Sequence, residues 1–152
     1  MHRLLVRQIM TSDVVTVGPD VLVVDAAETM ETRGVRHLPV LDDEGFLVGI
    51  VTDSDIREAE TVDSVLSSYD PQTAPRWLTV ADIMTTDIVT ISPDATVGEL
   101  AAILVQNKVG GAPVVEPDAN HPNRPRLTGI VTETDIFTMI AAAWEAESTG
   151  ST

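Results

Sequence analysis

The sequence predicts an α+β fold of the α/β type, made of two copies of one β-α-β-β-α unit. The stretch 9–20 returns as 83–94, and 49–56 returns as 129–136 with six of eight residues identical. Within each copy, short extended runs and helical apolar periodicity follow one another in the same order. Self-similarity of this kind indicates a repeated structural unit that buries its apolar face against its neighbour.

Length and composition fit a globular chain of this class. With 152 residues, the chain can form a hydrophobic core without crosslinks. Its 43% of hydrophobic residues argues against intrinsic disorder. The absence of cysteine excludes disulfides, thiolate metal sites and a thiol nucleophile. It also fits a reducing compartment, so we expect the protein in the cytoplasm.

The net charge narrows the choice of partners. The chain has 24 acidic and 9 basic side chains, a formal charge of −15. Such a polyanion repels phosphate backbones and anionic lipids, so we expect no nucleic acid and no membrane as partner. No apolar run approaches the roughly 18 residues of a membrane-spanning helix, and residues 1–8 lack the apolar core of a signal peptide. The acidity serves either solubility or the attraction of a basic partner.

The first copy opens with an extended segment at 14–17, which ends at the turn Pro19-Asp20. A helix follows, and Gly34 is suited to cap its C-terminus. The apolar residues of this helix recur at the spacing of one helix face: Val23, Ala26, Ala27 and Met30.

The second copy repeats this order from an extended segment at 88–91 and a second Pro-Asp turn. Thr96 and Glu99 have the spacing of a capping box, which predicts the start of the next helix. Its apolar residues again recur at helical spacing: Val97, Leu100, Ala101 and Leu104.

A hairpin is predicted next in each copy. In the first copy, 38–41 and 46–51 flank the short stretch Asp42–Gly45, which predicts a glycine-containing turn. The second copy has six more residues at this point, within 116–127, and three of the residues there are proline. We therefore expect an irregular loop in the second copy.

A second helix is expected after Asp55 and after Asp135. Residues 6–60 then form the first repeat, 61–79 a linker with a partial helix at 62–67, and 80–145 the second repeat. We expect a disordered tail at 146–152. The last helix has an apolar face: Ile136, Met139, Ile140, Ala143 and Trp144.

Three motifs carry a family resemblance. They are the Ile-Met-Thr openings at 9–11 and 83–85, the block Val-Arg-His-Leu-Pro-Val at 35–40, and the Gly-Ile-Val-Thr-x-x-Asp motifs at 49–55 and 129–135. Together they resemble a tandem pair of cystathionine-β-synthase-type (CBS) domains, the arrangement called a Bateman module. The resemblance spans nearly the whole chain.

The resemblance implies a fold in which the two copies pack by their strand surfaces about a pseudo-twofold axis and leave two clefts. It implies that an adenosine-type ligand binds there: AMP, ADP, ATP, S-adenosylmethionine or a cyclic dinucleotide. It also implies a homodimer and a sensor rather than an enzyme. We expect AMP or ATP as the first choice of ligand, no catalytic cofactor, no metal, and a regulated protein that this chain does not encode.

The resemblance assigns ligand contacts by motif position. Asp55 and Asp135 would hold the ribose, because a carboxylate accepts charge-assisted hydrogen bonds from a diol. The hydroxyls before them, with the free N–H groups of a helix start, suit phosphate or sugar oxygens: Thr52, Ser54, Thr132 and Thr134. The alternative is purely structural, with the aspartates stabilising helix N-termini and the threonines capping them.

Basic residues are assigned to phosphate in the same way. Arg36 and His37 match positions at which family members place phosphate contacts, and Arg57 is a third candidate. Each could instead be an ordinary surface or salt-bridging residue. The second copy has Gly110-Gly111 and Phe137 at these positions, so we expect unequal sites, one more cationic than the other. The apolar walls around the base would come from Val17, Val35, Leu38, Pro39, Ile91, Val109, Ala112 and Pro113.

The favoured function is a stand-alone regulatory module that binds an adenosine-containing ligand and changes the conformation of a dimer. The alternative is a constitutive dimerisation or protein-interaction scaffold without a nucleotide, with Val105 and Trp144 supplying apolar interface surface. The three histidines are widely separated, and the chain has neither a phosphate-loop motif nor a nucleophile elbow. We therefore do not expect an enzyme.

Overall fold

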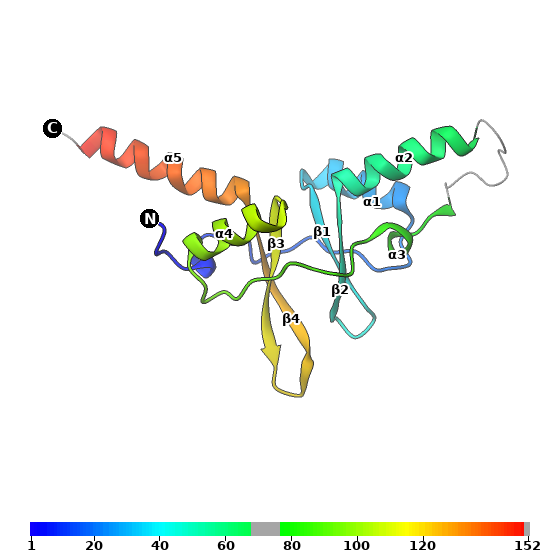
Figure 1. Cartoon of the computed structure of the whole chain (residues 1–152), viewed down its shortest axis with the longest axis horizontal. Coiled ribbons are helices and arrows are strands. Elements are labelled where there is room, and N and C mark those ends of the chain that lie inside the picture. The colour runs from blue at the N-terminus through cyan, green and yellow to red at the C-terminus, as the bar shows by residue number, and fades with distance from the viewer. Residues whose placement is uncertain (68–76, 151–152) are drawn as a thin grey trace. The chain divides into compact units, whose positions relative to one another are not determined.

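The computed structural model describes residues 1–67 and 77–150 (Figure 1). The chain divides into two units, which we name by their place in the sequence. The inner unit is Val15–Ile88, and the outer unit is made of the two stretches on either side of it in the sequence, Met1–Val14 and Val89–Thr152. Parts of the predicted linker and of the predicted tail, at 68–76 and 151–152, lie outside the described residues. None of the described helices is long and apolar enough to cross a membrane.

The inner unit contains a helix, a hairpin and a second helix in the predicted order. Its elements are α1 (Val23–Arg33), β1 (His37–Leu41), β2 (Leu47–Thr52), α2 (Asp53–Ser67) and the short α3 (Val80–Ile83). The two strands form an antiparallel sheet whose pairs run from His37–Thr52 to Leu41–Leu47. The helices α1 and α2 pack together, and α3 contacts both α2 and β2.

The turns of the inner unit have the predicted form. In the hairpin, Asp42 Oδ1 accepts hydrogen bonds from the backbone N–H groups of Glu44 (3.0 Å) and Phe46 (2.9 Å). Gly45 has a φ of 86°, and Gly34, at the C-terminal end of α1, has a φ of 67°. Both values lie in the left-handed region that glycine adopts without steric cost.

The outer unit repeats this order after a short 3-10 helix. Its elements are η1 (Val6–Gln8), α4 (Val97–Asn107), β3 (Gly111–Asp118), β4 (His121–Thr132) and α5 (Glu133–Gly150). The Thr96 side chain caps α4 as predicted, because its Oγ1 accepts a hydrogen bond from the Glu99 N–H at 3.1 Å. At the other end of α4, Lys108 takes the left-handed position that Gly34 holds in the inner unit, with a φ of 56°.

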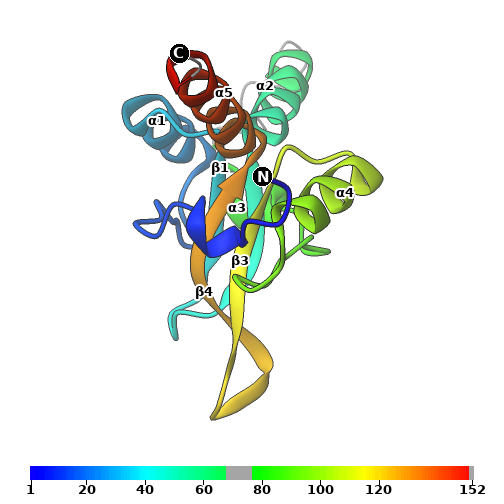
Figure 2. The same ribbon diagram turned by 90° about the vertical axis from the view of Figure 1, so that its left-hand side faces the viewer.

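The irregular loop predicted for 116–127 is wrong, because β3 and β4 continue through it as a long ribbon (Figures 1 and 2). The strands stay paired at Glu116–Arg126 and at Asp118–His121, with a register shift in between that leaves Pro117 unpaired. Proline is tolerated at such bulges and on outer edges, and a two-stranded ribbon has an outer edge on each strand. The prolines therefore do not break the pairing.

The extended segments predicted at 14–17 and 88–91 form single bridges rather than strands. Val17 bridges Val40 in parallel, and Ile91 bridges Val114 in the same way. The sheets named above are therefore two-stranded in each unit. Each segment is bonded to the hairpin of its unit, since the Val17 N–H donates to the Pro39 carbonyl and the Ile91 N–H donates to the Pro113 carbonyl, both at 3.1 Å.

Helix ends differ from the prediction at the start of α2, at the start of α5 and at the end of α5. The second helix of each repeat begins before its aspartate, at Asp53 in α2 and at Glu133 in α5. The partial helix predicted at 62–67 is present, as the last part of α2. The disordered tail predicted from 146 is wrong, because α5 continues to Gly150. Its alanines and glutamates are strong helix formers, which accounts for the extension.

The Ile-Met-Thr openings lie on the hairpin of the opposite copy. The backbone of Thr11 exchanges two hydrogen bonds of 2.9 Å with Ile130, and Thr85 exchanges bonds of 2.9 and 3.0 Å with Ile50. The first opening therefore belongs to the outer unit and the second to the inner unit. The repeats of the sequence and the units of the structure divide the chain differently at these segments.

Each unit has its own apolar core. In the inner unit, fully buried Val80 packs in a cluster with Leu38 and Val51. In the outer unit, fully buried Val6 packs in a cluster with Leu100 and Val131. Val6 and Val80 occupy the same position, three residues before each opening, and lie 74 residues apart.

Candidate functional site

The Thr-x-x-Asp motifs close the first turns of α2 and α5. Asp55 Oδ2 accepts hydrogen bonds from the backbone N–H (2.9 Å) and the Oγ1 hydroxyl (3.0 Å) of Thr52. Asp135 Oδ2 accepts the same two bonds from Thr132, at 2.8 and 3.3 Å. Each aspartate is thus part of a helix cap, as in the structural alternative from the sequence.

The second carboxylate oxygen of each aspartate takes no part in the cap. Within residues 1–67 and 77–150, Oδ1 of Asp55 and Oδ1 of Asp135 make no hydrogen bond. Both side chains are half-buried. A carboxylate that is fixed through one oxygen can accept hydrogen bonds from a ligand through the other without first being ordered.

The basic pair Arg36 and His37 lies at the same end of the hairpin as the Thr52 cap. His37 pairs with Thr52 across the two strands, and the Asp53 N–H donates to the Arg36 carbonyl at 3.0 Å. The Arg36 side chain is exposed, and its guanidinium makes no bond to any described residue. At this end of the inner unit, the backbone of Arg36 is therefore bonded to the first turn of α2, which also contains Asp55.

The outer unit has the same backbone arrangement without the cations. Gly111 pairs with Thr132, and the Glu133 N–H donates to the Gly110 carbonyl at 2.9 Å. The two glycines stand where Arg36 and His37 stand in the inner unit. The surroundings of the two aspartates therefore differ in charge, and unequal ligand sites stay a prediction.

Arg57 is held by the first turn of its own helix. Its guanidinium donates to Asp53 Oδ2 at 3.3 Å and to Ser54 Oγ at 3.4 Å. The Arg57 side chain is 70% exposed, so this pair contributes little to stability. The structure brings Arg57 and Ser54 together. The hydroxyl of Thr134, the outer counterpart of Ser54, is exposed.

The predicted apolar walls are mostly parts of the two cores. Val17 and Val35 pack at the edge of the inner core, and Val109 is 36% exposed at the end of α4. The others are buried: Leu38, Pro39, Ile91, Ala112 and Pro113.

The predicted site residues of the inner unit include some that line two different cavities. Asp55 lines a cavity of about 320 Å³ together with Leu78, Ile83 and other residues. Val35 and Arg57 line a different cavity, of about 290 Å³, beside Ile56. Because Asp55 and Arg57 project from different faces of α2, the inner unit by itself does not bring them into one cavity.

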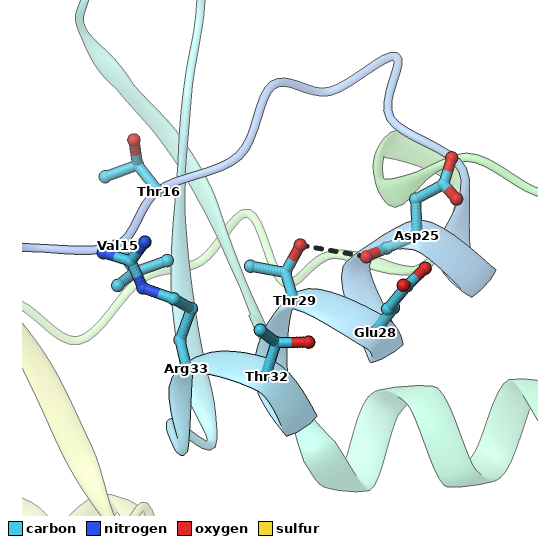
Figure 3. A pocket seen from close by; sticks show the side chains of 7 residues that line it. All are labelled: Val15, Thr16, Asp25, Glu28, Thr29, Thr32 and Arg33. Atoms are coloured by element: carbon cyan, nitrogen blue, oxygen red, sulfur yellow. Dashed lines mark hydrogen bonds between the residues drawn. The ribbon is translucent and has the colours of Figure 1, made fainter.

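A larger cavity of about 580 Å³ contains no residue predicted for the site. Figure 3 shows the Arg33 side chain extending from α1 toward the segment that contains Val15. Sequence reasoning missed this cavity because the α1 residues that line it have the pattern of an ordinary solvent-exposed helix face. The lining residues are Val15, Thr16, Asp25, Glu28, Thr29, Thr32 and Arg33.

Among the described residues, no group of three or more histidine, aspartate or glutamate side chains could hold a metal ion. Asp55 and Asp135 act in this structure as hydrogen-bond acceptors at the starts of their helices.

A comparison with models of protein families identifies the family of this chain. The CBS domain model matches residues 6–61 and 80–142. The chain belongs to the CBS domain family. These matched segments contain the Thr52–Asp55 and Thr132–Asp135 caps described above.

Relatives of this CBS domain pair include short and long proteins. A CBS domain-containing protein of Dictyostelium discoideum is 31% identical, and the match covers 94% of this chain and 95% of that protein. Inosine-5'-monophosphate dehydrogenase of Methanocaldococcus jannaschii is 34% identical over 86% of this chain, but the match spans only 22% of the dehydrogenase. Similarity to that enzyme is therefore confined to about a fifth of its length.

Solved structures of CBS domain pairs have the same fold. The CBS domain pair of protein MJ0100, in complex with 5'-methylthioadenosine and S-adenosyl-L-methionine, matches with a TM-score of 0.72 and 27% identity, covering 91% of this chain and 97% of that one. CBSX2 in complex with AMP matches with a TM-score of 0.71 and 27% identity, covering 95% and 98% of the two chains.

Proposed function

We propose that this CBS domain pair is a stand-alone regulatory module that binds an adenosine-containing ligand and thereby changes the conformation of a homodimer. The observation that carries the proposal is the pair of equivalent caps, each with one aspartate oxygen engaged and the other without a partner among the described residues. A ribose diol suits such an oxygen, because hydroxyl donors bond strongly to a carboxylate. The similar structures in complex with AMP and with S-adenosyl-L-methionine support an adenosine ligand.

We assign the ribose to Asp55 in the inner unit and to Asp135 in the outer unit. The nearby hydroxyls of Ser54 and Thr134 would donate to sugar or phosphate oxygens. Thr52 and Thr132 already use their hydroxyls to hold the aspartates, so their role is to position them.

The two ends differ in the charge that they offer a ligand. Arg36 is exposed and its carbonyl is bonded to the start of the helix that contains Asp55, and glycines take the place of Arg36 and His37 beside the helix that contains Asp135. On a chain with a formal charge of −15, a local cation decides where a phosphate can bind. We therefore expect AMP or ATP at the inner unit, and at the outer unit only ligands that do not depend on a phosphate contact.

Thermal unfolding with AMP, ATP, S-adenosylmethionine and cyclic di-AMP tests the ligand class. A ligand present at a hundredfold excess over its dissociation constant should stabilise the protein by about 2.7 kcal/mol. Failure of all four ligands to raise the melting temperature would overturn the proposal.

Amide variants separate ligand binding from capping. In Asp55→Asn and Asp135→Asn, the side-chain oxygen can still accept the threonine bonds, but the charge that favours the ribose is gone. We expect AMP to lose most of its stabilising effect on Asp55→Asn and to keep it on Asp135→Asn. Asp42→Asn is the matched control, since Asp42 also accepts two backbone N–H groups but lies at the opposite end of the hairpin. An equal response of all three variants to AMP would contradict the assignment.

A constitutive scaffold is the second candidate function. Large apolar side chains of α5, among them Phe137 and Trp144, are exposed. Apolar surface of this kind marks interaction sites in soluble proteins. A stable homodimer whose melting temperature responds to none of the four ligands would favour the scaffold.

A further inference from the structure

The largest of the three cavities described above lies entirely within the inner unit. It measures about 580 Å³ and is enclosed between the segment of Val15 and Thr16 and one side of α1 (Figure 3). It shares no lining residue with the cavities that contain Asp55 and Arg57. The cavity is therefore separate from the helix caps to which we assign the adenosine ligand.

Three charged side chains line this cavity, and they are spread along α1. Asp25 is in the first turn and Arg33 in the last, with Glu28 between them. At a rise of roughly 1.5 Å per residue, Glu28 and Arg33 are about 7.5 Å apart along the helix axis, and Asp25 and Arg33 about 12 Å. The Thr29 and Thr32 side chains lie between the two ends (Figure 3). The cavity thus has an acidic end and a basic end, with hydroxyl groups between them.

These charges have no partner in the part of the chain that the structure describes. The carboxylates of Asp25 and Glu28 and the guanidinium of Arg33 make no hydrogen bond and no ion pair with any residue of 1–67 or 77–150. Their spacing accounts for this, because ion pairs on a helix join residues three or four apart, and Glu28 and Arg33 are five apart. All three residues are exposed, so a ligand can reach them without breaking an existing interaction.

The second repeat forms the same helix without this set of charges. Like α1, α4 has 11 residues, and it has Ala102 and Asn107 at the positions of Glu28 and Arg33. The fold of the repeat therefore does not require these two charges. Their presence on α1 is a property of the first repeat that needs another explanation.

The charges at the cavity define which ligand would complement them. Two carboxylates and one guanidinium match a ligand with two cationic groups and one anionic group. Asp25 and Glu28 would repel a ligand rich in phosphate, and a simple diamine would leave Arg33 without a partner. An amino acid with a cationic side chain has the matching set of an α-carboxylate, an α-ammonium and a side-chain cation.

We propose that this cavity of the inner unit binds a free amino acid with a cationic side chain, such as lysine or arginine. Arg33 pairs with the α-carboxylate, because a guanidinium binds a carboxylate through two parallel hydrogen bonds. Glu28 pairs with the α-ammonium, and Asp25 pairs with the side-chain cation. Thr29 Oγ1 donates its own proton to the Asp25 carbonyl at 3.0 Å, so it faces a ligand as an acceptor and suits an ammonium group.

Calorimetric titration of the full chain with L-lysine and L-arginine tests this site. Because exposed charges interact weakly across water, we expect a dissociation constant on the order of 1 mM. L-Norleucine lacks the side-chain cation and L-lysinamide lacks the carboxylate, so both should bind at least about tenfold more weakly than L-lysine. Sodium chloride is matched in all titrations, since salt screens exposed charges.

Two variants remove the charges by introducing the residues of the second repeat. Glu28→Ala and Arg33→Asn give α1 the residues that α4 has at these positions, and each should weaken the binding of L-lysine at least about tenfold. Glu31→Ala is the matched control for Glu28→Ala, because it removes the same charge from α1 but Glu31 lines a different cavity. It should leave the binding of L-lysine nearly unchanged.

Amide chemical shifts of the parent protein locate the ligand without any substitution. L-Lysine should shift the amide signals of Thr16, Thr29 and Thr32, which line the cavity, and should leave those of Thr90 and Ile103, the aligned residues of the second repeat, in place. This measurement keeps the test valid even where a variant fails to fold.

Three results would overturn the proposal. The first is no saturable binding of L-lysine or L-arginine up to about 20 mM, well above the expected dissociation constant. The second is binding of L-norleucine or L-lysinamide as tight as that of L-lysine, and the third is an equal loss of binding in Glu28→Ala and Glu31→Ala. Failure of AMP to stabilise the protein would overturn the proposed function and leave this site standing, since no contact with AMP is assigned to α1.

Discussion

At the residue scale, Gly49 and Gly129 lie where an opening segment passes closest to a hairpin. A Cβ added at Gly129 would lie 2.7 Å from the sulfur of Met10 and 3.0 Å from the carbonyl oxygen of Thr11. At Gly49 it would lie 2.5 Å from the sulfur of Met84 and 3.2 Å from the carbonyl oxygen of Thr85. The glycine of each Gly-Ile-Val-Thr motif thus makes room for the Ile-Met-Thr motif of the opposite copy.

Gly129→Ala should destabilise the protein by about 1–3 kcal/mol, the usual cost of overpacking. Gly49→Ala should cost less, since a flexible methionine can yield more easily than a backbone carbonyl, and the carbonyl is farther away there. Gly18→Ala is the control, because an added Cβ meets nothing within 4 Å. Urea denaturation measures all three, and an effect of Gly129→Ala no larger than that of Gly18→Ala would contradict the close approach.

The sequence predicts the helix caps but not the cavities. The spacing of Thr52 and Asp55 is a local signal, since both partners lie in one helix turn, and the structure has them bonded as such a signal requires. Which cavity Asp55 or Arg57 lines depends instead on how α1 and the segment around Leu78 pack against α2. No local pattern in the sequence encodes that packing.

At the element scale, the β3–β4 ribbon shows how a correct local observation led to a wrong expectation. Three prolines within 116–127 do remove backbone donors, but a ribbon of two strands tolerates them at its outer edges and at a bulge. The tip is closed by Asp118, whose Oδ1 accepts a hydrogen bond from the Asn120 N–H at 2.9 Å. His121 Nδ1 lies 3.5 Å from the other carboxylate oxygen.

The tip should make a pH-dependent contribution to stability. The hydrogen bond from the Asn120 N–H, and then the charge of His121, hold the pKa of Asp118 below its ordinary value, although burial opposes them. Because the folded pKa is the lower one, ionised Asp118 stabilises the fold above its unfolded pKa of about 3.9. This contribution disappears as the pH falls through the folded pKa.

We expect Asp118→Asn to be less stable than the parent protein near neutral pH and equally stable in acid. The amide oxygen can still accept from Asn120, so the variant removes mainly the charge. Urea denaturation from about pH 7 to about pH 2 measures the difference between the two proteins. A difference that stays constant over this range would contradict the ionic contribution of Asp118.

At the scale of the whole molecule, the two openings are exchanged between the repeats. In the outer unit, the residues that precede the first opening also bond to α4: the Leu4 carbonyl accepts from the Val97 N–H at 2.7 Å, and the His2 carbonyl accepts from the Gly98 N–H at 2.8 Å. The first N–H groups of a helix have no backbone acceptor within the helix itself. These bonds therefore satisfy donors in the first turn of α4. The repeat was evident from the sequence, but the exchange was not, because identical openings fit either copy equally well.

Val6 and Val80 provide a matched test of the exchange. Both are valines with no exposed surface at the same repeat position, so each change to alanine should cost about 1–3 kcal/mol. Native-state hydrogen exchange then locates the loss. Val6→Ala should reduce protection in α4 and β3 of the outer unit, and Val80→Ala in α1 and β1 of the inner unit, since each valine packs in that unit's core. If each opening packed on its own repeat instead, the two patterns would be reversed, with Val6→Ala weakening α1 and β1.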